Sequence, residues 1–184
     1  EPLMVLPPNN QLFRTAAEEN ATLSIGLPKG QGFSMTHYYM LRDPNDGEQP
    51  LQNWILEGSN NKVNWALVHN GKDTSSVSED EKGFLYQVPQ VIGHPPFRYH
   101  RLRAVGDQSD EAQPIRLSGI EFYGELYGAG LENPSEFDPV CEPRVFTYQE
   151  DFDGNGIVAF FATSDGSHAY DNPSLRGLVK TSSS

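Results

Sequence analysis

The sequence lacks the disulfide-forming cysteines that stabilise very small proteins and the long apolar runs that anchor proteins in a membrane. Cys141 is the only cysteine among 184 residues, which excludes an intramolecular disulfide and leaves a zinc site in need of other ligands. The longest uninterrupted apolar run, 157–162, has six residues, far short of the roughly 20 that span a bilayer. We therefore expect a protein of a reducing compartment and predict a cytoplasmic location.

Positive charge is also scarce. The sequence has 13 Lys and Arg but 25 Asp and Glu, so the formal net charge is −12. This balance repels phosphate backbones and anionic lipids, which argues against nucleic-acid or membrane partners. The five histidines form no metal-binding or hydrolase motif, and the sequence has no nucleophile elbow or nucleotide-binding glycine loop. We therefore expect no enzyme activity.

Turn-forming residues are abundant instead, with 17 Gly and 14 Pro. Between the turns lie short segments rich in aromatic and β-branched residues, without a 3.6-residue apolar period. The pattern predicts an all-β fold, an antiparallel sandwich or barrel. The expected strands are 35–42, 54–57, 64–68, 84–88, 97–105, 115–123, 145–148, 157–163 and 178–181.

Two of these strands carry a more detailed prediction. The strand at 64–68 is followed by Asn70-Gly71, a dipeptide typical of tight hairpin turns. In 115–123 the apolar positions change parity across Ser118-Gly119, which predicts a bulge at Gly119. Two separate short strands are the alternative.

Composition divides the chain into three parts. Residues 1–127 form the main body, 128–143 is a connector rich in Gly, Pro and acidic residues, and 144–184 holds the last strands. Three strands in about forty residues cannot bury two faces alone, so this tail must pack on the body or on another chain.

Several motifs follow one another in a known order. Tyr39-Met40-Leu41-Arg42 precedes a Trp strand with a Gly-Ser-Asn turn (51–60), a second Trp (64–65), an aromatic-Arg strand (97–102) and a closing Leu-Ser-Gly-Ile-Glu-Phe-Tyr-Gly (117–124). Together they resemble the discoidin-like family, a galactose-binding-type jelly roll, in the form found in large HECT-type ubiquitin ligases and BTB proteins. The related DOC domains of ubiquitin ligases share this fold.

The resemblance implies an antiparallel jelly-roll β-sandwich that acts as a non-catalytic recognition module. It would bind a protein or peptide through its end loops, within a ubiquitin ligase or a similar large cytoplasmic protein. The alternative is a carbohydrate-binding module, with Tyr38, Tyr39 or Phe33 beside Asn45 as the sugar platform. The tail resembles the segment that normally opens such a domain, so the domain is either circularly permuted or followed by a truncated second copy. We favour permutation, because a half-domain would expose an unpaired sheet edge.

End loops of a jelly roll are the usual ligand surface, because a rigid sheet positions chain that is free to vary. The candidate ligand-binding residues come from two loops, 28–33 and 43–50, and from Arg42 at a strand end. Phe33 would be an apolar anchor unless it simply begins the next strand, and Arg42 would bind a carboxylate. The full set is Lys29, Gln31, Phe33, Arg42, Asn45 and Asp46.

A second candidate is a run of positive charge between 97 and 105. In a strand, Arg98 and His100 would share one face with Leu102, while Arg101 and Arg103 share the other with Tyr99. We predict an anion or peptide patch at Arg98 and His100 that could hold an acidic or phosphorylated peptide. The alternative is ion pairing with carboxylates of the chain itself.

One segment resembles a metal loop. Asp151, Asp153, Asn155 and Gly156 match the opening of a calcium-binding loop, but Ala162 stands where the bidentate Glu is required. We expect a polar turn and no cofactor, with a non-EF calcium site as the alternative.

Overall fold

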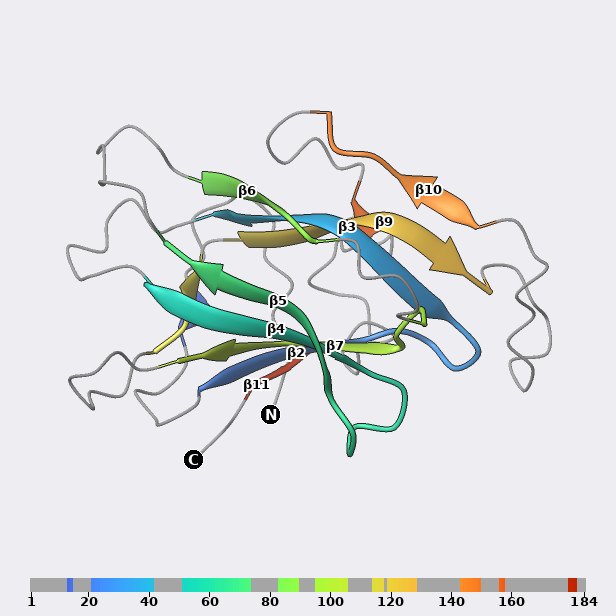
Figure 1. Cartoon of the computed structure of the whole chain (residues 1–184), viewed down its shortest axis with the longest axis horizontal. Coiled ribbons are helices and arrows are strands. Elements are labelled where there is room, and N and C mark those ends of the chain that lie inside the picture. Colours follow the sequence, from blue (N-terminus) through green and yellow to red (C-terminus); the bar gives the residue numbers. More distant parts are fainter. Residues whose placement is uncertain are drawn as a thin grey trace.

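The molecule is a sandwich of two antiparallel sheets, as predicted. The computed structural model describes residues 13–14, 21–41, 51–73, 83–89, 95–105, 114–117, 119–128, 143–149, 156–157 and 179–181. One sheet has four strands in the order β10-β9-β3-β6, the other has five in the order β11-β2-β7-β4-β5, and β1 pairs with β8 (Figure 1). The strands are β1 (Phe13–Arg14), β2 (Thr22–Gly26), β3 (Gly32–Leu41), β4 (Asn53–Ser59), β5 (Ala66–Lys72), β6 (Gly83–Gln87), β7 (Tyr99–Ala104), β8 (Arg116–Leu117), β9 (Gly119–Tyr127), β10 (Arg144–Phe146) and β11 (Val179–Thr181).

Aromatic residues join the two sheets through the core. Trp54 on β4 is fully buried, and its Nε1 donates a hydrogen bond of 2.8 Å to the hydroxyl of Tyr38 on β3. That hydroxyl also lies 2.7 Å from Nδ1 of His69 on β5. Tyr38 stacks on Tyr86 of β6 at 5.1 Å between ring centroids. The polar ends of these rings are therefore satisfied inside the core, which is required when they leave water.

The predicted turn at Asn70-Gly71 is wrong. Both residues lie inside β5, which pairs with β4 as far as Asn53 and Lys72. A Cβ atom at Gly71 would lie 2.1 Å from Cε2 of Trp54. Gly71 therefore serves the close approach of the Trp54 indole to the β5 backbone, not a reversal of the chain.

The predicted bulge at Gly119 is wrong as well, and the alternative of two strands is confirmed. Arg116 and Leu117 pair with β1, whereas β9 starts at Gly119 and pairs with β3. Leu117 and Ile120 both enter the core, which explains the change of apolar parity. The register shift in this sheet lies in β3 instead, between Met35 and His37.

The tail pairs with the body at two sheet edges. β10 pairs with β9, and β11 pairs with β2. Of the strand expected at 157–163, the structure describes Ile157, which is buried and not in a strand. The three-part division of the chain and the circular permutation stay predictions. Within the described ranges, no helix is long and apolar enough to cross a membrane.

The outer faces of the two sheets differ. On the four-stranded sheet, Tyr39, Glu121 and Tyr123 point away from the core yet are at most 4% exposed. Tyr148 stacks on Tyr39 and meets Tyr123 edge-on at 5.3 Å, and the backbone of Gly156 lies against Glu121. The five-stranded sheet presents partly exposed side chains on its outer face, which makes it the open side of the sandwich.

Candidate functional site

Three segments meet at one end of the five-stranded sheet: 27–31, 60–65 and 95–98 (Figure 1). The backbone N–H of Arg98 donates to Oδ1 of Asn60 at 2.8 Å, and the Asn60 amide donates to the carbonyl of Pro96 at 3.3 Å. The N–H of Leu27 donates to the carbonyl of Arg98 at 2.8 Å. These bonds tie the loops into one surface, which we call the loop end.

The β4–β5 loop is held by its own polar side chains. Ser59 Oγ accepts the N–H of Lys62 at 2.9 Å, and Asn61 Oδ1 accepts the N–H groups of Val63 and Asn64 at 2.9 and 2.8 Å. Lys62 has a φ of 61°, the left-handed conformation that non-glycine residues seldom adopt. The result is a fixed loop with Val63 at its tip, 78% exposed.

Cations and aromatic rings alternate from this loop onto the outer face of the sheet. We call this set the cation–aromatic surface; it consists of Glu57, Lys62, Trp65, Arg98, Tyr99, Arg101 and Arg103. The Arg101 guanidinium lies 4.0 Å from the centre of the Trp65 ring. Lys62 Nζ and Arg98 Cζ lie 4.5 and 4.9 Å from the centre of the Tyr99 ring. Trp65 Nε1 donates to the carbonyl of Lys62 at 3.2 Å within the loop, and the Arg101–Trp65 contact links the loop to the sheet.

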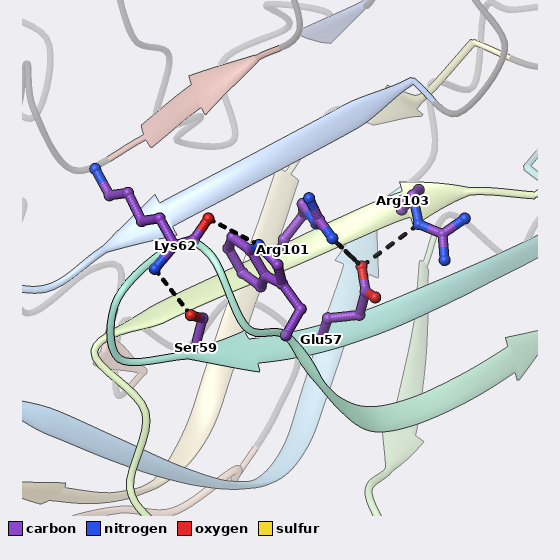
Figure 2. A network of polar contacts seen from close by, with 6 residues as sticks. Glu57, Ser59, Lys62, Arg101 and Arg103 are labelled. Carbon is purple, nitrogen blue, oxygen red and sulfur yellow. Dashed lines mark hydrogen bonds and ion pairs between the residues drawn. The ribbon is translucent and has the colours of Figure 1, made fainter.

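One carboxylate serves two arginines on this surface. Oε2 of Glu57 lies 2.8 Å from Nη2 of Arg101 and 3.4 Å from Nε of Arg103 (Figure 2). The predicted ion pairing with carboxylates of the chain is thus confirmed for both arginines. For Lys62 and Arg98, the structure gives no carboxylate partner among the residues it describes. The surface holds four cations and one anion, and its net charge is positive.

His100 does not belong to an anion patch. The predicted alternation holds for His100 and Leu102, but the face they share is the core, where His100 is 2% exposed. Its ring packs against Phe33, Phe97 and Phe122 at about 6 Å between centroids. Burial lowers the pKa of His100 to about 4, so the ring is neutral at pH 7 and cannot attract an anion.

Arg98 separates from His100 because β7 begins one residue later, at Tyr99. Its side chain turns along the loop end, where Nε donates to the carbonyl of Leu27 at 3.0 Å. The predicted pair is therefore split: Arg98 lies at the surface and His100 in the core.

The structure describes the first of the two predicted loops but not the second. Phe33 is 1% exposed within β3, so its role as an anchor is wrong and the alternative, that it begins a strand, is confirmed. Lys29 is exposed and Gln31 half-buried at the loop end. Residues Arg42, Asn45 and Asp46 lie outside the described residues. The chain leaves β3 at Leu41, roughly 30 Å along the strand from Gly32.

The predicted sugar platform is also wrong. Tyr38, Tyr39 and Phe33 are at most 2% exposed, so none can stack on a sugar ring. Trp65 and Tyr99 are partly exposed, but cations already cover ring faces of both.

The candidate calcium residues Asp151, Asp153 and Asn155 lie outside the described residues, and that site stays a prediction. In the described part of the chain, no three His, Cys, Asp or Glu side chains are grouped so that they could hold a metal ion.

Sequence reasoning missed Lys62, Val63 and Trp65. Their roles depend on the fixed β4–β5 loop, which the strand expected at 64–68 obscured. The alternation of Tyr99, Arg101 and Arg103 was the available signal, since it placed both arginines on one face with an aromatic ring.

Comparison with known proteins gives one curated relative and a set of similar structures. No family model matches the chain. E3 ubiquitin-protein ligase hecd-1 of Caenorhabditis elegans is 27% identical over 126 residues, which are 68% of this chain but 5% of that protein. A carbohydrate-binding module of a Clostridium perfringens glycoside hydrolase is 16% identical at a TM-score of 0.47, covering 62% of this chain and 76% of the other. A fucose-binding module of Streptococcus pneumoniae is 13% identical at a TM-score of 0.46, covering 62% and 70%.

Proposed function

We propose that this chain is a non-catalytic recognition module of a ubiquitin ligase, or of a similarly large cytoplasmic protein. It binds a protein or peptide partner at the loop end of the five-stranded sheet. The similarity to hecd-1 supports the ligase context, because it covers 68% of this chain. In that context the chain is a small part of a longer protein and selects what the rest of the protein acts on.

Val63 is the observation that carries the proposal. It is 78% exposed on a loop whose backbone is already held by Ser59 and Asn61. A fixed loop loses little conformational freedom on binding, so more of the contact energy remains as affinity. An exposed aliphatic side chain beside Trp65 and several cations is suited to the centre of a small binding hot spot.

The described histidines support a non-catalytic function. His100 is in the core, His69 is bonded to the buried Tyr38, and His37 Nδ1 lies 3.1 Å from Thr36 Oγ1. Thr36 in turn donates its hydroxyl hydrogen to the carbonyl of Tyr123 at 3.2 Å. Each of these rings has a structural role, and the threonine hydroxyl is engaged with the backbone.

The ring contacts favour a peptide over a carbohydrate. Sugar recognition needs an open aromatic face beside polar groups, whereas Arg101 lies over the Trp65 ring, and Lys62 and Arg98 lie over the Tyr99 ring. A sugar would compete with these cations for the rings.

Two valines provide a matched test. Val63 is at the loop end, and Val145, 62% exposed, lies on β10 of the other sheet. We would apply the labelled chain to a peptide array and a glycan array, and repeat both with Val63→Asp and Val145→Asp. We expect peptide binding that weakens about tenfold in Val63→Asp and persists in Val145→Asp. Binding to glycans alone, or equal effects of the two variants, would overturn the proposal.

A further inference from the structure

We propose that the partner presents an extended acidic segment, with carboxylates at alternate positions, to the outer face of β7. This inference rests on the proposed function and names the chemistry of the ligand. The segment would start at Val63 on the loop end and continue past Arg101 toward Arg103.

Charge is the first argument. The cation–aromatic surface carries four cations and one carboxylate, within a chain of net charge −12. Among the described residues, ten Lys and Arg outnumber four Asp and Glu. Opposite charge on a partner raises the rate of association and orients it.

Glu57 shows where a carboxylate fits. Its Oε2 accepts both Nε and Nη2 of Arg101, at 3.0 and 2.8 Å, and also lies 3.4 Å from Nε of Arg103. A guanidinium has five N–H donors, and the contacts with Glu57 involve two nitrogens of Arg101. Arg101 is 25% exposed, so a second carboxylate can approach it from solvent.

Spacing is the second argument. Tyr99, Arg101 and Arg103 follow one another at every second position of β7, which places them about 7 Å apart. An extended peptide repeats its own side chains at the same interval on one face. Ser24 and Thr22 of β2 pair with Arg101 and Arg103, so hydroxyl-bearing residues flank the row. Carboxylates at alternate positions would therefore meet Arg101 and Arg103 from one face of the peptide, whereas carboxylates at every third position would point to opposite faces in turn.

The same surface is poorly suited to nucleic acid. Base stacking requires open aromatic faces, and Lys62 and Arg101 already lie over the rings of Tyr99 and Trp65. The net charge of −12 also opposes a polyanion that extends beyond the patch. A short peptide can remain within the positive surface.

The test uses three labelled peptides and the whole chain, with fluorescence anisotropy as the readout. The first peptide has one Val followed by alternating Glu and Ser, the second has the same composition with its Glu residues at every third position, and the third has Gln in place of Glu. We expect the alternating peptide to bind about tenfold more tightly than either of the others. Its affinity should also fall as salt rises from about 50 to about 200 mM.

Arginine variants complete the test. Arg101→Gln should weaken binding of the alternating peptide about tenfold, and Arg144→Gln, at an exposed arginine of β10, should leave it unchanged. Thermal unfolding checks that each variant folds. If Arg101→Gln does not fold, Arg98→Gln takes its place, because Arg98 precedes the strand.

The outcomes separate the two proposals. Equal binding of the alternating peptide and the peptide with Glu at every third position would overturn the spacing. The Gln peptide could bind as tightly as the alternating peptide and lose that binding in Val63→Asp. This result would overturn the acidic preference and leave the proposed function standing. Equally tight binding of a short single-stranded oligodeoxythymidine would mean that the surface accepts any anion. No peptide binding on the array would overturn both proposals.

Discussion

The two outer faces of this sandwich are built from similar residues but are covered to different degrees. Both carry tyrosine and glutamate. On the four-stranded sheet, Tyr39 and Tyr123 are buried beneath Tyr148, and Glu121 is buried against Gly156. On the five-stranded sheet, Tyr99 and Glu57 remain partly exposed beside arginines. Residue type alone therefore does not identify an open face. A face is open or buried according to whether another part of the chain covers it.

Matched tyrosine truncations should show the largest effect. Tyr123 is fully buried, so Tyr123→Ala should lower the free energy of unfolding by about 3–5 kcal/mol through lost burial and a residual cavity. Tyr99→Ala, on the open face, should cost about 1 kcal/mol. Urea denaturation of both variants measures the two values. Equal losses would mean that the two faces are covered to the same degree.

Acid should destabilise the protein through His100, beneath the open face. Its pKa is about 4 in the folded chain and 6.5 when unperturbed, so the unfolded state binds the proton more readily in between. Its contribution is complete above pH 6.5 and is lost as the pH falls through this window, by up to about 3 kcal/mol. Urea midpoints at several pH values, compared with those of His100→Leu, isolate this group. Parallel pH profiles would show that His100 does not control the response.

Removing one carboxylate from each sheet should have the smallest effect on stability. Glu57→Gln takes away the internal anion of Arg101 and Arg103, so affinity for the alternating peptide should rise about threefold. The free energy of unfolding should fall by about 1 kcal/mol, because the ion pairs are partly exposed. Glu125→Gln, which removes the charge from the acceptor of the Tyr127 hydroxyl on β9, should leave affinity unchanged. A loss of affinity in Glu57→Gln would show that Glu57 organises the arginines for binding.

Much of the fold could be predicted from local patterns. Alternation of apolar residues located most strands, because each strand has one face in the core. The turn at Asn70-Gly71 could not be judged locally, since Gly71 accommodates Trp54, a residue 17 positions earlier. The division of 115–123 into β8 and β9 likewise depends on which partner strand each half meets.

The site was less predictable from the sequence, because it depends on which way each side chain points and on which parts of the chain cover it. Alternation placed Arg101 and Arg103 together, but it could not tell that the opposite face, with His100, was the core. Phe33 sits between loop-like glycines and yet lies inside β3. The stacking of Trp65 on Arg101 joins a loop to a strand that is far away in sequence, and no local pattern encodes that contact.

At Lys62, selection for stability and selection for the proposed ligand binding would favour different residues. Its φ of 61° suits Gly or Asn better than a side chain of this length, so the chain retains local strain at this position. Directed evolution for heat resistance should replace it with a smaller residue, whereas selection for ligand capture should keep the ammonium group. The backbone conformation at position 62 thus favours a smaller residue, whereas the proposed recognition favours lysine.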